Sequence, residues 1–261
     1  MPAFPFEQIK TSVNFDAGHV VQWKLSADYK GRPPICAVLQ IAENESFETV
    51  IKEIPSATFY AVDDSRLKQN WDVNHVYRIK LIDSDDQITY SQPFNFDLDN
   101  IPRHKYLLAS EIIRKEWVRL QYVGVSGWLL KRRHFGVEAT QELDPVTKVP
   151  LTDNPISFGV GFNGGYYPAA RFIYSQENRQ QDTKLDEQGM GVRHDETVGL
   201  RCPGFPGVDV QDVVVGPDGK RWFVANVQER FFPGTHTTLI QEVQCRIIPN
   251  TDSVYRINVP E

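Results

Sequence analysis

The densest cluster of titratable side chains in the sequence is His194-Asp195-Glu196. An imidazole beside carboxylates could serve as a general base with an orienting partner, or as part of a metal site. Adjacent side chains point in different directions, however. These three residues therefore cannot bind one metal ion together, or act as a general base with its orienting partner, without help from other residues. We expect a solvated loop here.

Acidic and glycine groups raise the question of ion or phosphate binding. Asp63-Asp64 and residues 83–86 gather hard carboxylate oxygens, but they lack the spaced ligands and the glycine of a calcium loop. Gly164-Gly165, Gly159 and Gly161 lack the following lysine and helix of a phosphate cradle. The sequence also holds no Gly-x-Ser-x-Gly elbow, His-Glu-x-x-His motif or Cys–His candidate pair. We therefore expect no catalytic residue, no cofactor and no metal, and a protein that is not an enzyme.

Positive charge is concentrated in one part of the chain. The 261 residues carry a formal net charge of −6, which speaks against non-specific coating of DNA. Residues 103–134 nevertheless contain eight Lys/Arg and two acids, so this window is near +6 and the remainder near −12. The contrast predicts an electrostatically matched protein partner, or a surface that faces passing DNA. The candidate interface residues are Arg114, Lys115, Arg119, Lys131, Arg132 and Arg133.

The compartment follows from the cysteines and from the apolar runs. Cys36, Cys202 and Cys245 lie far apart, which argues against a disulfide scaffold and fits a reducing cytoplasm. Residues 1–5 lack the basic and apolar regions of a signal peptide. No apolar run approaches the length of a membrane span. We expect a protein that is made and used in solution, away from membranes.

The elements that must position these residues are mainly strands. Residues 20–25, 35–41 and 58–62 are β-branched and aromatic runs of strand length. In residues 77–81, Tyr, Ile and Leu alternate with Arg and Lys, as a half-buried antiparallel strand requires. An early Trp, a late Tyr and a Ser-x-Pro exit at 91–93 resemble fibronectin type III and related immunoglobulin-like sandwiches. We predict such a sandwich over residues 1–97.

A helix and a second β unit follow. A polar linker over residues 97–102 ends in Pro, and a helix is predicted over 102–122. Its expected apolar face consists of Tyr106, Ala109, Ile113, Trp117 and Leu120. We assign this helix and a β-ribbon to residues 98–175.

Residues 176–261 are expected to form an exposed arm, over about 176–190, and a small β-barrel. Strands are predicted over 208–215 and 220–227, joined by a Gly-Pro-Asp-Gly hairpin, and then over 236–248 and 253–259. This run is similar to the small barrels of phage head-closure and connector proteins. The predicted fold is therefore mainly β with one long amphipathic helix.

Three segments carry a more specific resemblance: the basic helix at 105–117, Gly-Trp-Leu-Leu-Lys-Arg-Arg at 127–133, and Phe-Asn-Gly-Gly-Tyr-Tyr-Pro at 162–168. Together they resemble a segment of virion structural proteins at the head-to-tail neck of tailed bacteriophages. In that family a zinc knuckle with two Cys-x-x-Cys pairs lies between the second and third segments. The corresponding positions here are Ala139, Glu142, Asn154 and Ser157, so all four sulfurs are missing. We expect a zinc-free β-ribbon.

The resemblance implies a structural virion protein in the neck, repeated as a homo-oligomeric ring. Its expected partners are neighbouring portal, neck or tail proteins, with packaged DNA close by. The alternative is a decoration or adhesion module that binds carbohydrate or a cell surface, with Trp71, Tyr60 or Tyr90 as an aromatic platform. A third hypothesis, a remnant of a nucleic-acid-binding ribbon, is disfavoured by the acidic average.

Overall fold

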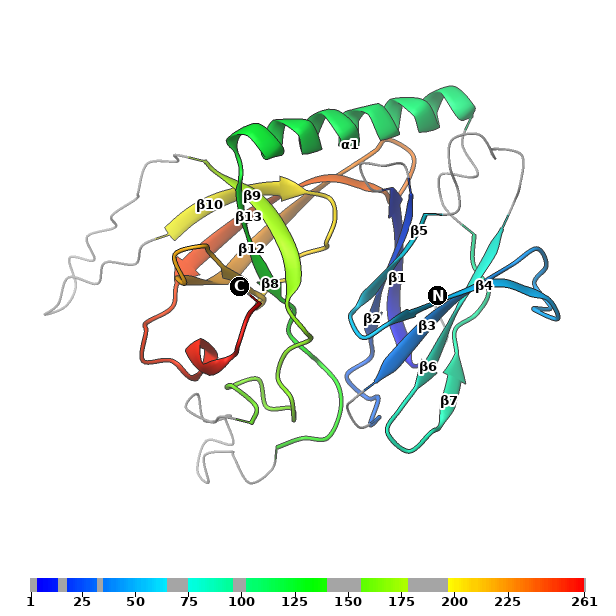
Figure 1. Ribbon diagram of the computed structural model, residues 1–261, viewed down its shortest axis with the longest axis horizontal. Coiled ribbons are helices and arrows are strands. Elements are labelled where there is room, and N and C mark those ends of the chain that lie inside the picture. The colour runs from blue at the N-terminus through cyan, green and yellow to red at the C-terminus, as the bar shows by residue number, and fades with distance from the viewer. Residues whose placement is uncertain are drawn as a thin grey trace, which may run out of the picture.

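The computed structural model describes residues 4–13, 18–31, 35–64, 75–95, 102–139, 156–177 and 197–260. These residues form a β-sandwich, a closed β-barrel and one helix that lies across both (Figure 1). The fold is thus mainly β with a single long helix and a small C-terminal barrel, as the sequence predicts.

The sandwich consists of two antiparallel sheets. One sheet has the order β1 (Phe6–Val13), β2 (His19–Leu25) and β5 (Tyr60–Asp63). The other has the order β4 (Val50–Ser56), β3 (Cys36–Ala42), β6 (Val76–Ile82) and β7 (Ile88–Tyr90).

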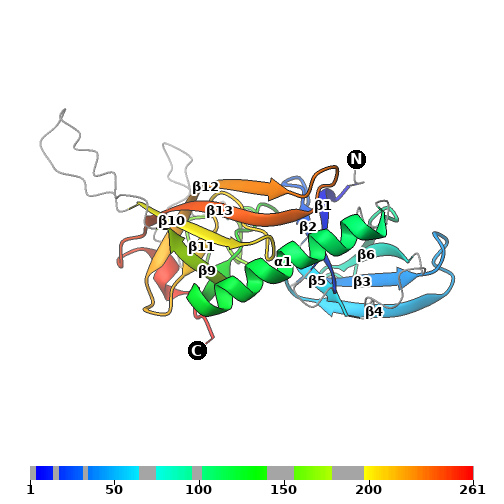
Figure 2. The same cartoon turned by 90° about the horizontal axis from the view of Figure 1, so that it is seen from above.

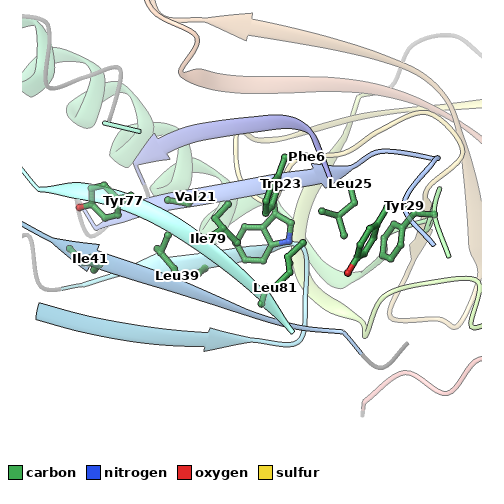
Figure 3. Close-up of a cluster of buried hydrophobic side chains, with 13 residues drawn as sticks. Phe6, Val21, Trp23, Leu25, Tyr29, Leu39, Ile41, Tyr77, Ile79 and Leu81 are labelled. Carbon is green, nitrogen blue, oxygen red and sulfur yellow. The ribbon is translucent and has the colours of Figure 1, made fainter. Parts of the chain in front are cut away.

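The core of the sandwich lies between these sheets (Figure 3). Trp23 of β2 faces Ile79 and Leu81 of β6, and Leu39 of β3 packs beside them. The alternation predicted for residues 77–81 is confirmed, since Tyr, Ile and Leu of β6 are fully buried and Arg and Lys are not.

Six strands close the barrel. Their order is β10 (Thr197–Pro203), β13 (Thr238–Ile247), β12 (Arg221–Phe231), β11 (Val213–Val215), β8 (Val125–Leu130) and β9 (Ala170–Glu177). The expected boundary at 175/176 therefore falls inside β9, and the barrel draws strands from both the second and the third expected segments. The hairpin at 216–219 is confirmed, with the N–H of Gly216 donating to the carbonyl of Lys220 at 2.9 Å.

Two predicted strands of the C-terminal unit are wrong in part. Residues 253–256 form a 3₁₀ turn, because Asp252 caps the N–H of Val254 at 2.9 Å and the Arg221 guanidinium donates to the Val254 carbonyl. Residues 208–212 form a turn before β11, because the Asp212 carboxylate accepts the N–H of Asp209 at 2.7 Å. Side-chain acceptors and a buried guanidinium hold the backbone out of the sheet at both places.

The helix α1 (Arg103–Val123) rests on the sandwich at one end and on the barrel at the other (Figures 1 and 2). Tyr106, Ala109 and Ile113 pack with Val13 of β1 and with Phe232, just after β12. Four of the five residues of the predicted apolar face are buried, and Trp117 is half-buried. The helix therefore packs against both units and holds them in a fixed arrangement.

Candidate assembly interface

The six predicted interface residues fall into two groups with different surroundings. Three lie on α1 and three follow β8 directly. The structure does not bring them onto one surface, because Lys131 is buried and Arg132 and Arg133 are partly buried.

Arg114 and Lys115 are the members that face solvent, with side chains 53% and 74% exposed. Both pair with Glu111 on the same helix, Arg114 through its Nε at 3.0 Å and Lys115 at 3.7 Å. Such exposed pairs contribute about 0–1 kcal/mol to stability. These two cations are therefore available to a partner without loss of the fold.

Arg119 anchors the helix instead. Its guanidinium and that of Arg201 on β10 both donate to the carboxylate of Glu116, at 2.7 Å and 2.8 Å. Burial alone would raise the pKa of Glu116, but the hydrogen bonds from these two cations outweigh it and the pKa is lowered. This triad ties the C-terminal half of α1 to the barrel.

Lys131 lies inside the molecule, at the junction of the two units. Its Nζ atom donates to Asp209 at 2.7 Å and to the carbonyl of Gly207 at 3.0 Å, and lies 3.1 Å from Asp212. It also lies 5.2 Å from the ring centroid of Phe59, which belongs to the sandwich. A buried ammonium with this set of partners has a structural role.

Two carboxylates thus share one ammonium, and their pKa values move apart. Burial would lower the pKa of Lys131, but Asp212 and Asp209 outweigh it and raise the pKa. Burial raises the pKa of the enclosed Asp212 to about 6 even with Lys131 beside it. The pKa of the more exposed Asp209 is lowered, because Lys131 outweighs its partial burial. As the pH falls, Asp212 therefore takes up a proton before Asp209 does.

Arg132 and Arg133 are half-buried. Arg132 donates through Nη2 to the carbonyl of Val160 at 3.1 Å, and Arg133 lies 5.1 Å from the ring centroid of Tyr167. Burial lowers the pKa of both guanidinium groups. Reversing their charges would disturb packing as well as charge, so they are poor probes of an external interface.

Direct contacts lock the sandwich to the barrel around this cluster. Lys10 of β1 pairs with Glu229 of β12 at 2.7 Å, and the N–H of Gly207 donates to Gln22 of β2 at 2.6 Å. A cavity of about 30 Å³ lies among these groups, large enough for water. No local pattern in the sequence indicates this junction, because its members lie up to 219 positions apart.

The predicted aromatic platform on the sandwich does not assemble among the described residues. Tyr60 faces the barrel, where its ring meets that of Phe205 at a centroid distance of 4.8 Å. Tyr90 is exposed and lies under the guanidinium of Arg78. Trp71 lies outside the described residues. Tyr60 and Tyr90 therefore point in different directions and cannot flank one sugar ring together.

An open groove of about 750 Å³ lies on the outside of the barrel, beside the end of α1. Trp117, Trp128 and Arg171 line it, together with residues 215–217 and the C-terminal Val259 and Pro260. Two indole rings and one guanidinium are groups that bind flat or anionic ligands.

The candidate metal positions are only partly described. Segments 132–139 and 156–166 approach each other through isolated bridges, and the N–H of Ala139 donates to the carbonyl of Gly161 at 3.0 Å. Glu142, Asn154 and the cluster His194-Asp195-Glu196 lie outside the described residues. Within the described ranges, no three His, Cys, Asp or Glu side chains gather as metal ligands do. The absence of zinc stays a prediction.

A search with protein-family models gives no match, and neither does a search of curated proteins. Among the described residues, no helix is long and apolar enough to cross a membrane.

Proposed function

We propose that this chain is a structural virion protein of a tailed bacteriophage and forms part of the head-to-tail neck. In this proposal it is repeated as a ring and contacts neighbouring portal, neck or tail proteins, with packaged DNA passing nearby. It has no catalytic role in the proposal.

The observation that carries the proposal is how the segment that resembles neck proteins is built into the fold. Helix α1 and strand β8 lead from the sandwich into the barrel. In the run at 162–168, Tyr167 donates its N–H to the carbonyl of Lys131 at 2.9 Å, and its ring lies 5.8 Å from that of Phe59 in the sandwich. A ring subunit must transmit load between neighbours without changing shape, and a buried ion cluster at the junction favours such rigidity. The exposed cations Arg114 and Lys115 supply a surface for an acidic neighbour.

The proposal is tested by following the chain through purified particles. We expect its peptides in tailed particles at a constant, small copy number relative to the major capsid protein, and at the head–tail joint after disruption. Finding the chain only in the soluble fraction of the lysate, with particles free of it, would overturn the proposal.

The groove beside α1 favours the alternative of a decoration or adhesion module. Its two indole rings lie outside the barrel, where a carbohydrate could reach them. A glycan array would test this, with Trp128→Ala as the variant and Tyr90→Ala as a control outside the groove. Glycan binding that depends on Trp128 supports the adhesion module, and no binding disfavours it.

A further inference from the structure

Helix α1 turns one long face away from the rest of the molecule (Figures 1 and 2). We call the residues along its midline the outer stripe: His104, Leu108, Glu111, Lys115, Val118 and Tyr122. Leu108, Val118 and Tyr122 are 55%, 41% and 86% exposed, although they are large and apolar. The flanking Leu107 is exposed as well. A helix face that only meets water does not need such side chains.

The spacing of the outer stripe is that of a coiled-coil seam. Successive members are separated by four, three, four, three and four residues, which keeps them on one line of contact with a neighbouring helix. Apolar members flank a charged pair at the centre, and polar aromatic rings lie at the two ends. The pattern therefore indicates a helical partner.

The outer stripe is complementary to itself when it is reversed. Its members form three pairs that lie equally far from residue 113: Leu108 with Val118, Glu111 with Lys115, and His104 with Tyr122. An antiparallel second copy would thus place apolar groups against apolar groups and carboxylate against ammonium, twice each. A parallel copy would place Glu111 against Glu111 and Lys115 against Lys115, which is repulsive.

We propose that the outer stripe of α1 pairs, antiparallel, with the same stripe of a second copy of this chain across a two-fold axis. This pairing does not depend on the neck function. A two-fold contact closes on itself, so a ring would be built through other surfaces. A single helix pair buries an area at the low end for specific complexes, so we expect micromolar self-association.

The test measures self-association of the full chain by sedimentation, with circular dichroism as the check of folding. Glu111→Lys and Lys115→Glu alone each place like charges opposite one another, and we expect dimerisation to weaken by about tenfold or more. Each substitution lies on an exposed or half-exposed position, so the fold is retained. An equimolar mixture of the two variants restores both opposite-charge pairs and is expected to form a heterodimer.

A second experiment changes an apolar residue of the outer stripe. Leu108→Glu is expected to abolish self-association, whereas Ile88→Glu, at a similarly exposed apolar site on β7, leaves it unchanged. A monomeric native chain at about 100 µM, where micromolar association would be complete, would overturn the proposal. So would a mixture of the two charge variants that associates no better than either alone.

Discussion

The ammonium of Lys131 lies 3.1 Å from the carboxylate of Asp212, and both residues are buried. Lys131 follows β8 and Asp212 precedes β11, so the pair connects the ends of two neighbouring barrel strands. Phe59 of the sandwich covers the ammonium. This charge, which the sequence places in a basic patch, thus joins two barrel strands and contacts the sandwich through the ring of Phe59.

Removing the ammonium should destabilise the protein strongly. In Lys131→Met, Asp212 is left buried without its cation, and we expect a loss of about 3–5 kcal/mol in the free energy of unfolding. Urea denaturation at pH 7.5 measures it. Lys30→Met, which removes an exposed lysine outside the outer stripe, is the matched control and should change stability by about 0.5 kcal/mol or less. Equal effects of the two substitutions would contradict the structural role of Lys131.

The raised pKa of Asp212 predicts a pH dependence. Its folded value of about 6 lies above the ordinary 3.8, so the folded state holds this proton more tightly than the unfolded chain. The stabilisation that comes from protonated Asp212 is fully present below its ordinary pKa of 3.8, and it is lost as pH rises through about 6. Relative to Asp212→Asn, the native protein should therefore lose about 2–3 kcal/mol between about pH 4 and pH 7. A difference that stays flat, or grows with pH, would show that Asp212 is not the titrating group.

The contribution of Glu116 to stability should change with pH in the opposite direction. Its folded pKa is lowered, so its contribution is present above the ordinary value of 4.5 and is lost as pH falls. Glu116→Gln weakens the bonds from Arg119 and Arg201, and we expect a loss of about 1–3 kcal/mol at pH 7 with faster hydrogen exchange in α1. Glu138→Gln, at an exposed glutamate away from α1, serves as the control. If exchange in α1 does not change, the triad does not anchor the helix.

The elements with strong local signals could be predicted from the sequence. Period-two alternation located β6, and 3.6-residue periodicity located α1 to within a residue or two. Strand β1 (Phe6–Val13) was missed, because the first predicted strand is residues 20–25. What sequence periodicity cannot show is long-range pairing, which places β8 and β9 in one barrel with β10–β13.

The candidate site was less predictable for the same reason. Lys131 stands in a run of three cations that locally indicates an exposed basic patch. Its partners Asp209 and Asp212 lie about 80 positions away, and nothing near them in the sequence shows that they are buried. Arg114 and Lys115 lie on the outer face of a helix whose buried side was recognised, so their exposure could be inferred.

The sandwich is expected to fold without the rest of the chain, because residues before 97 supply every buried member of its described core except Phe135. A fragment of residues 1–97 should unfold cooperatively, though at lower denaturant concentration than the full chain. The cut exposes Phe59, which packs with Tyr167 beyond the fragment, so Phe59→Ser should improve its solubility. Circular dichroism in urea is the measurement. A fragment without a cooperative transition would show that the junction is required for folding.

Electron microscopy of particles assembled without this protein tests the central claim, a place in the head-to-tail neck, most directly. If the chain joins the two parts, a deletion of its gene should yield heads and tails that are complete but separate, or heads that have lost their DNA. Supplying the full chain from a plasmid should restore tailed, infectious particles. Normal tailed particles from the deletion would contradict the neck assignment.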